Sequence, residues 1–258
     1  ALTGTDDGQL IFTKSSGKLM AWSATSPIAH AGSTERIEAF ITGLCAVSAD
    51  EYVTTVADAA GLAVYGLDAP RRLIAAFQDG TIRDIHLGSD AGDGMVYARM
   101  DRTGDIYRIR RTQLTFAESA GLNTLLDRFV SPVVVATLSQ MRVTTVDGET
   151  TLRIEYENGD DNIGQRWFWD ENAVTRDEFT DAYLSIIALQ FDQTAPQEAA
   201  GTSLLADVTF TLRDGSTSTV RYEACDAFYA LVTTDGGGRF LVRLTDVENM
   251  LTVLKGEK

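Results

Sequence analysis

The sequence has very few cysteines. Cys45 and Cys225 are the only two in 258 residues, and they follow neither a metal-binding nor a redox spacing. Two cysteines also form no disulfide framework of the kind that stabilises small secreted domains. We expect both to be buried free thiols rather than a bridged pair.

Long apolar runs are absent as well. No window approaches the roughly 20 apolar residues that a membrane-spanning helix requires, and no basic-then-apolar signal segment is present. The chain begins with Ala1 rather than Met, so a trimmed or processed protein is expected. The lack of a targeting segment in this sequence is therefore no evidence that the gene product lacks one.

Basic residues are scarce relative to acidic ones. Lys and Arg total 22 against 37 Asp and Glu, giving a net charge of −15. This balance argues against nucleic-acid binding and against docking on anionic lipid through a basic patch. The hydrophobic fraction of 44% and mean hydropathy of −0.05 are typical of a globular protein with a sizeable core.

Catalytic motifs are missing. The two histidines, His30 and His86, lie in no triad or metalloprotease context. There is no nucleophile elbow, P-loop or dinucleotide fingerprint, and the glycines at 236–238 are expected in a hairpin turn because no helix opens on them. The sequence thus predicts no catalytic residue, no metal ligand set and no cofactor.

Two acidic stretches, residues 89–94 and 157–162, offer oxygen ligands. Neither fits the twelve-residue calcium loop with its terminal Glu, so both are expected to be solvated loop tips. A carboxylate pair for glycoside hydrolysis would need a separation of about 5 to 9 Å, which sequence alone does not reveal.

The first half of the chain alternates between strand and helix signals. Period-two patterns predict strands at 9–13 and 18–23, and a helix follows from a cap at Ser33 or Thr34. Residues 50–62 are less regular. Strands are then predicted at 73–77 and 82–87 around Asp79-Gly80, and at 96–100 and 106–109 around a turn at 102–104. A helical stretch from Thr112 is expected to end at Pro132.

The same order of signals returns in the second half. Strands are predicted around Asp147-Gly148, a helix behind the capping box of Thr175 and Glu178, four more strands, and a last helix from Thr245. Trp169 takes the place of Trp22, so it is expected in the core. Corresponding turns and caps lie 133 to 147 positions apart.

This pattern predicts an α+β fold of two tandem pseudo-repeats, residues 1–132 and 133–258. Each would contain a hairpin, a helix, a four-stranded antiparallel meander and a terminal helix. A single irregular α+β domain is the alternative. Only residues 1–6 precede the first Asp-Gly turn, so the opening strand of the first copy is expected to be truncated.

The stretch from Tyr65 to Arg72 is predicted to be a rigid elbow between helix and sheet. Pro70 fixes its own φ and pushes the preceding residue toward extended geometry, while Gly66 permits a left-handed step. Tyr65 and Leu67 are expected to be its buried anchors. The second half has residues 196–203 in its place, so the fold does not require this string as such.

The motif Tyr65-Gly66-Leu67-Asp68-x-Pro70 carries a resemblance, together with Leu87-Gly88, Tyr97-Ala98-Arg99 and the later strings at 106–109 and 125–128. It resembles a bacterial domain-of-unknown-function family. Members look like single-pass membrane proteins with an N-terminal helix and an extracytoplasmic region of such repeats, and many are encoded beside gliding-type ABC-2 transporter genes. The resemblance implies no catalytic residue.

Five residues are candidates for binding: Asp68, Arg71, Arg72, Arg99 and Trp167. The first four would form a polar spot at the elbow, and Trp167 a partner or sugar platform. The leading hypothesis is a non-enzymatic extracytoplasmic interaction or ligand-sensing module, held by an N-terminal membrane anchor outside this chain, with transporter subunits as partners. The alternatives are an extracellular carbohydrate-binding or carbohydrate-processing protein and a structural spacer.

Overall fold

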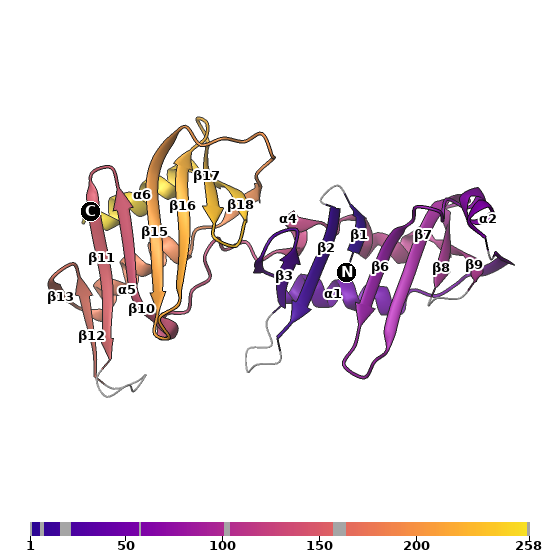
Figure 1. Ribbon diagram of the computed structural model, residues 1–258, viewed down its shortest axis with the longest axis horizontal. Helices are drawn as coiled ribbons and strands as arrows, with labels where there is room; N and C mark the ends of the chain where they lie inside the picture. Colours follow the sequence, from indigo (N-terminus) through magenta and orange to yellow (C-terminus); the bar gives the residue numbers. More distant parts are fainter. Residues whose placement is uncertain are drawn as a thin grey trace. The chain divides into compact units, whose positions relative to one another are not determined.

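The computed structural model describes residues 2–5, 8–15, 22–56, 58–100, 104–156 and 164–256. The chain divides into two compact units, Ala1–Asp127 and Arg128–Lys258. Each unit is built on one antiparallel sheet with helices, so the fold is mixed α+β (Figure 1).

Unit 1 is a nine-stranded sheet in the order β4-β3-β2-β1-β6-β7-β8-β9-β5. Its strands are β1 (Leu2–Thr5), β2 (Gly8–Lys14), β3 (Trp22–Ser26), β4 (His30–Ala31), β5 (Glu51–Thr55), β6 (Arg71–Ala76), β7 (Ile82–Gly92), β8 (Met95–Met100) and β9 (Asp105–Arg110). Its helices are α1 (Thr34–Ala46), α2 (Ala59–Val64), η1 (Arg111–Leu114), α3 (Thr115–Glu118) and α4 (Leu122–Leu125).

Unit 2 is a nine-stranded sheet in the order β13-β12-β11-β10-β15-β16-β17-β18-β14. Its strands are β10 (Leu138–Thr145), β11 (Gly148–Tyr156), β12 (Gln165–Trp169), β13 (Asn172–Val174), β14 (Phe191–Thr194), β15 (Ser203–Leu212), β16 (Thr217–Ala224), β17 (Tyr229–Thr234) and β18 (Arg239–Arg243). Its helices are η2 (Val135–Thr137), α5 (Arg176–Ile187) and α6 (Leu244–Leu254). Adding nine to each strand number of the first order gives the second.

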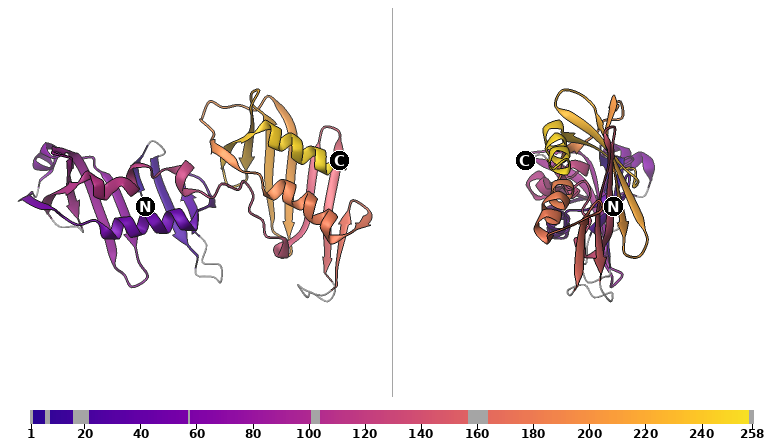
Figure 2. Two further views of the ribbon diagram at one scale, coloured as in Figure 1. Left: turned by 180° about the vertical axis from the view of Figure 1, so that it is seen from behind. Right: turned by 90° about the vertical axis from the view of Figure 1, so that its left-hand side faces the viewer.

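Each sheet has a helix-covered face and a second face that we call the open face. Figure 2 shows α1 lying across the sheet of unit 1, and α5 with α6 across that of unit 2. Strand alternation directs apolar side chains to the helices, so Leu73, Ile85 and Ala98 are 0% exposed in unit 1. The open faces carry the alternate residues of the same strands.

Three of the predicted Asp-Gly turns and the predicted capping box are confirmed, whereas the predicted cap Ser33 precedes α1 without a side-chain hydrogen bond to it. Asp79-Gly80, Asp147-Gly148 and Asp214-Gly215 each join two antiparallel strands. The capping box forms as well, because the Thr175 amide donates to Glu178 Oε2 at 2.9 Å and the Glu178 amide donates to Thr175 Oγ1 at 3.3 Å. These features depend on neighbouring residues alone, which is why the sequence reveals them.

The helix expected from Thr112 to Pro132 is wrong as one element. It is broken into η1, α3 and α4, and Gly121, which is fully extended at φ −161°, separates α3 from α4. The end of the stretch pairs with another segment instead: Leu126 forms a bridge with Gly32, and the Asp127 amide donates to the Ala31 carbonyl at 2.9 Å. Tertiary pairing therefore replaces the last helical turns.

Residues 50–62 hold more structure than expected. β5 pairs with β9 at the edge of the first sheet, and α2 follows, capped by Asp58, whose Oδ1 accepts from the Gly61 amide at 2.7 Å.

The predicted match between Trp22 and Trp169 is corrected. Trp22 begins β3, whereas Trp169 ends β12, so they lie at opposite ends of corresponding strands.

β1 spans four residues and pairs with β2 and β6, while β10 spans eight. Four predicted features lie wholly or partly outside the described residues: the first part of the Asp7-Gly8 turn, the turn near Gly17, residues 102–103 of the next turn, and the acidic stretch at 157–162. Within the described ranges, no helix has the length and hydrophobicity needed to cross a membrane.

Candidate functional site

The elbow is fixed onto the open face of the first sheet. Gly66 has φ +66°, and the preceding Tyr65 carbonyl accepts from the Ser89 amide at 2.8 Å. The Tyr65 ring meets the edge of Tyr97 on β8 with centroids 4.9 Å apart, and Leu67 is 3% exposed. Leu67 is thus the buried anchor that the sequence predicts, and Tyr65 is half-buried.

Gly88 on β7 makes this contact possible. A Cβ there would lie 2.2 Å from the Tyr65 carbonyl oxygen and 3.0 Å from Leu67 Cγ. Unit 2 provides a natural comparison, because the hairpin turns at Asp79 and Asp214 set positions 135 apart in register. The equivalent of Gly88 is Glu223, and a loop without a helix replaces the elbow there.

Adjacent arginines at the end of the elbow point to opposite faces, as strand alternation requires. Arg71 lies on the helix side, where its Nη2 donates to the Ala117 carbonyl at 2.5 Å. Burial lowers the pKa of Arg71, with Glu118 opposing the shift. Arg71 Nε is buried and finds no hydrogen-bond partner in the described ranges. Arg71 is therefore a structural residue on the helix side.

Arg72 lies on the open face and holds the carboxylate of Asp84. Its Nε donates to Oδ1 at 2.9 Å and its Nη2 donates to Oδ2 at 2.6 Å. The Asp84 side chain is 1% exposed, while that of Arg72 is 38% exposed. A buried carboxylate thus fixes a guanidinium whose other side reaches solvent.

His86 joins the same carboxylate. Its Nε2 lies 3.2 Å from Asp84 Oδ1, and its side chain is 26% exposed. Across the strands, His86 faces Arg72 on β6 and Arg99 on β8. Burial lowers the pKa of His86; Asp84 opposes this shift, and the two guanidiniums reinforce it. The imidazole therefore lies in a local environment made positive by two arginines.

We call Arg72, His86 and Arg99 the basic row. They occupy directly opposite positions on three neighbouring strands of the open face. In unit 2, Asp207 takes the position of Arg72 and Arg221 takes that of His86. These two residues form a simple ion pair, in which Arg221 donates from Nε and Nη2 to Asp207, each at 2.9 Å. Those side chains are 52% and 37% exposed.

The remaining candidates lie apart from the basic row. Asp68 is exposed on the elbow and makes no hydrogen bond or ion pair with the described residues, so Arg72 uses Asp84 in its place. Trp167 packs on the helix side, with its ring centroid 4.7 Å from that of Phe179 on α5. Trp167 and Trp169 are both half-buried, so Trp169 is not the core residue that the sequence predicts.

Asp84 and His86 were the partners that residue types alone did not indicate. The sequence does contain a signal for both. Pairing the strands outward from the Asp79-Gly80 turn, residue by residue, places His86 directly opposite Arg72, and strand alternation puts Asp84 on the same face. The burial of Asp84 depends on the surrounding fold and has no such local signal.

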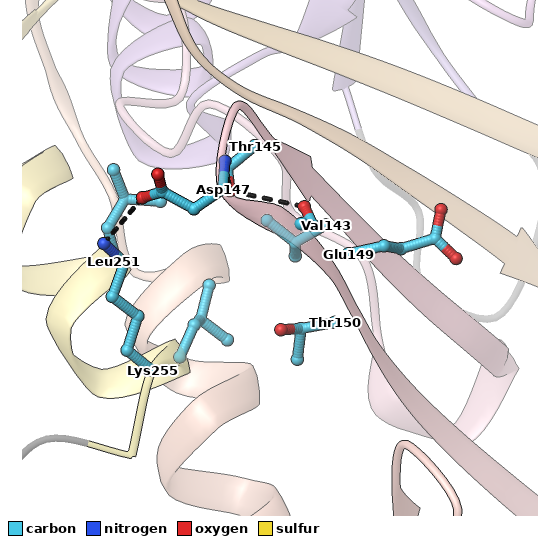
Figure 3. A pocket seen from close by; sticks show the side chains of 9 residues that line it. Val143, Thr145, Asp147, Glu149, Thr150, Leu251 and Lys255 are labelled. Atoms are coloured by element: carbon cyan, nitrogen blue, oxygen red, sulfur yellow. Dashed lines mark hydrogen bonds and ion pairs between the residues drawn. The ribbon is translucent and has the colours of Figure 1, made fainter.

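A shallow hollow of about 190 Å³ lies in unit 2, between the β10–β11 turn and the end of α6. Figure 3 shows Asp147 facing Lys255 across it, and these side chains form an ion pair of 2.9 Å. Its buried lining residues, Val143 and Leu254, are apolar, and its charged lining residues are exposed. This is the geometry of a gap where a helix ends over a hairpin, not of a built ligand site.

The acidic stretch at 89–94 is a loop tip only at residues 93–94, because β7 continues to Gly92, which corrects the expectation for the whole stretch. Asp90 pairs with Arg111 at 2.7 Å and accepts from the Gly92 amide at 2.8 Å. Across the ranges that the structure covers, no three metal-ligating side chains gather. Cys45 and Cys225 are both free, but neither is buried as expected, because Cys45 is exposed and Cys225 is half-buried.

The comparisons with known proteins give one family. A family model described as Domain of unknown function (DUF4340) matches residues 22–207. That range begins at β3 and ends inside β15, so it includes parts of both units, and the elbow and the basic row lie within it. No curated protein and no solved structure matches the chain.

Proposed function

The chain belongs to the family described as Domain of unknown function (DUF4340), and from this premise we propose that it is a non-enzymatic interaction or ligand-sensing module. We place it outside the cytoplasm, held at the membrane by an anchor that precedes this chain, with subunits of an ABC-type transporter as its partners. The cellular placement and the partner class rest on the resemblance carried by the Tyr-Gly-Leu-Asp-x-Pro motif.

The observation that carries the interaction role is the open face of the first sheet. Three partly buried basic side chains lie there beside the docked elbow, and two of them, Arg72 and His86, contact the buried carboxylate of Asp84. Such a surface, built on the strands of a sheet, suits contact with another protein, whereas small-molecule sites are usually concave. Charged side chains on a surface of this kind provide orientation and specificity in recognition.

We further infer that the two units are tandem copies of one fold. The equal strand orders and the matching hairpin turns support this inference. In the Asp79 turn, the Thr81 amide donates to Asp79 Oδ1 at 2.8 Å; in the Asp214 turn, the Ser216 amide donates to Asp214 Oδ1 at 2.9 Å. If the units are copies, the differences between their open faces mark where one copy has specialised.

Affinity capture from native membranes tests the proposed function. The full-length protein, tagged at its C-terminus, is purified after mild crosslinking, and the recovered proteins are identified by mass spectrometry. We expect a transporter subunit to be recovered in near-stoichiometric amount. A preparation that contains no membrane protein would refute the interaction role and favour a structural spacer.

A further inference from the structure

The basic row is an unusual arrangement for a sheet. Arg72 and Arg99 lie on either side of His86 across three neighbouring strands, although like charges close together on a sheet destabilise strand pairing. The equivalent positions in unit 2 are Asp207, Arg221 and Thr233, where an acidic residue replaces one base and a neutral residue another. The second sheet therefore has no cluster of basic side chains at these positions, whereas the first sheet has one.

The acidic residue of the cluster lies outside the row. Asp84 is two positions along β7 from His86 and is 1% exposed. From the same face it holds Arg72 through two hydrogen bonds and contacts His86. A carboxylate placed in this way orients the bases while their outer surfaces stay accessible, since Arg72 and His86 are 38% and 26% exposed.

The elbow borders the row on β7. Gly88 follows His86 on the same face, and the Tyr65 carbonyl and the Leu67 side chain pack over it. On β8 the Tyr65 ring covers Tyr97, which lies on the same face as Arg99. The basic row therefore lies across three strands, with the elbow packed along one side of it. This shape fits an extended chain segment better than an enclosed small molecule.

We propose that the basic row is a docking site for an acidic segment of a partner protein. Guanidinium groups pair with carboxylates in a planar geometry, and the row gathers three basic side chains in a chain whose net charge is −15. The inference rests on the proposed interaction function and specifies its contact surface. It assigns the partner's carboxylates to Arg99, His86 and the exposed side of Arg72.

A titration with a defined probe tests this assignment. Purified ¹⁵N-labelled chain is titrated with hexaglutamate, and with hexaglutamine as the uncharged control, while amide and His86 ring signals are followed by NMR. We expect saturable shifts confined to β6, β7 and β8 near the row, and a rise in the pKa of His86 as carboxylates approach it. Hexaglutamine should cause no such shifts.

Matched variants locate the site. Arg99→Gln should weaken hexaglutamate binding about tenfold, since a charge-assisted contact is lost. Arg221→Gln removes one positive charge from the equivalent surface of unit 2 and should leave the affinity unchanged. Thermal unfolding checks that both variants fold, and His86→Gln replaces Arg99→Gln if the latter does not.

Three outcomes overturn the proposal. Equal weakening by Arg99→Gln and Arg221→Gln would mean nonspecific charge attraction. Equally strong shifts with inorganic phosphate would assign the row to a small anion. A concentration-dependent dimer abolished by Arg99→Gln would make a second copy of this chain the occupant. Because the assay uses purified chain and a defined probe, its result is independent of whether membrane capture recovers a transporter subunit.

Discussion

Asp84 and Arg72 form a bidentate pair across β6 and β7, with N–O distances of 2.9 and 2.6 Å, and the carboxylate is almost completely removed from solvent at 1% exposure. His86, on the same face, contacts the same carboxylate through its Nε2. This three-residue contact joins the end of the elbow to the open face and so determines the geometry of the proposed docking site.

Removing the buried charge should destabilise unit 1. We expect Asp84→Asn to lower the free energy of unfolding by about 2 kcal/mol, because a guanidinium loses its buried partner. Urea unfolding measures this effect. Asp207→Asn, which breaks the exposed pair with Arg221 in unit 2, should cost less than about 1 kcal/mol. Equal losses in the two variants would contradict the buried role of Asp84.

Stability should fall on acidification through His86. Burial lowers its pKa from the ordinary 6.5, with the guanidiniums of Arg72 and Arg99 adding to the shift and Asp84 opposing it. The unfolded chain therefore binds the proton more readily than the folded one, so stability decreases as the pH drops below about 6.5 toward the folded pKa.

The comparison of wild type with His86→Gln isolates this effect. The thermal midpoint of the wild type should drop more steeply between pH 7.5 and 5.5, because the variant has no imidazole at this position to protonate. His30 is present in both proteins and cancels in the difference. Identical pH profiles would show that the imidazole titrates alike in the folded and unfolded states.

The elbow should depend on the missing side chain at position 88. Gly88→Ala would place a Cβ 2.2 Å from the Tyr65 carbonyl oxygen, so the elbow must shift, at a cost of about 2 kcal/mol. Equilibrium unfolding in urea gives the value. Gly104→Ala is the control, since its Cβ would come no closer than 3.3 Å to Thr55 Cγ2. A neutral Gly88→Ala would mean that the elbow is not tightly held.

Trp167 should act through packing. Its ring lies 4.7 Å from Phe179 between centroids and is half-buried, so Trp167→Ala should destabilise unit 2 by about 2 kcal/mol. Phe168→Ala removes a ring on the opposite face, where Arg153 lies 4.2 Å from its centroid, and should cost less than about 1 kcal/mol. An unchanged stability with lost binding on a glycan array would instead support a sugar platform.

Local signals in the sequence predicted the local parts of the fold. The Asp-Gly turns and the Thr175 capping box need only neighbouring residues. The predicted helix after Thr112 is broken at Gly121, which is extended, and Leu126 pairs with Gly32, a contact between positions far apart in the chain. Long-range pairing of this kind is invisible to periodicity.

The residues of the candidate site also divide into those that local sequence signals indicate and those that depend on long-range pairing. Arg72 and Arg99 were predicted from residue type, and alternation alone could have separated Arg72 from Arg71. Asp68 was predicted as the acidic partner of the arginines because it is close to them in the sequence, but Arg72 contacts Asp84 instead. Asp84 lies 12 positions from Arg72 along the chain but is directly hydrogen-bonded to it, and its burial arises only when the strands pair.

Site-specific photocrosslinking in the source cells identifies the protein that contacts the basic row. A photoreactive residue is placed at Ile74, beside Arg72 on the open face, and in a matched variant at Thr209, the equivalent position of unit 2. We expect an adduct with a transporter subunit from position 74, lost when Arg99 is changed to Gln, and none from position 209. Equal adducts from both positions, or from neither, would contradict this expectation.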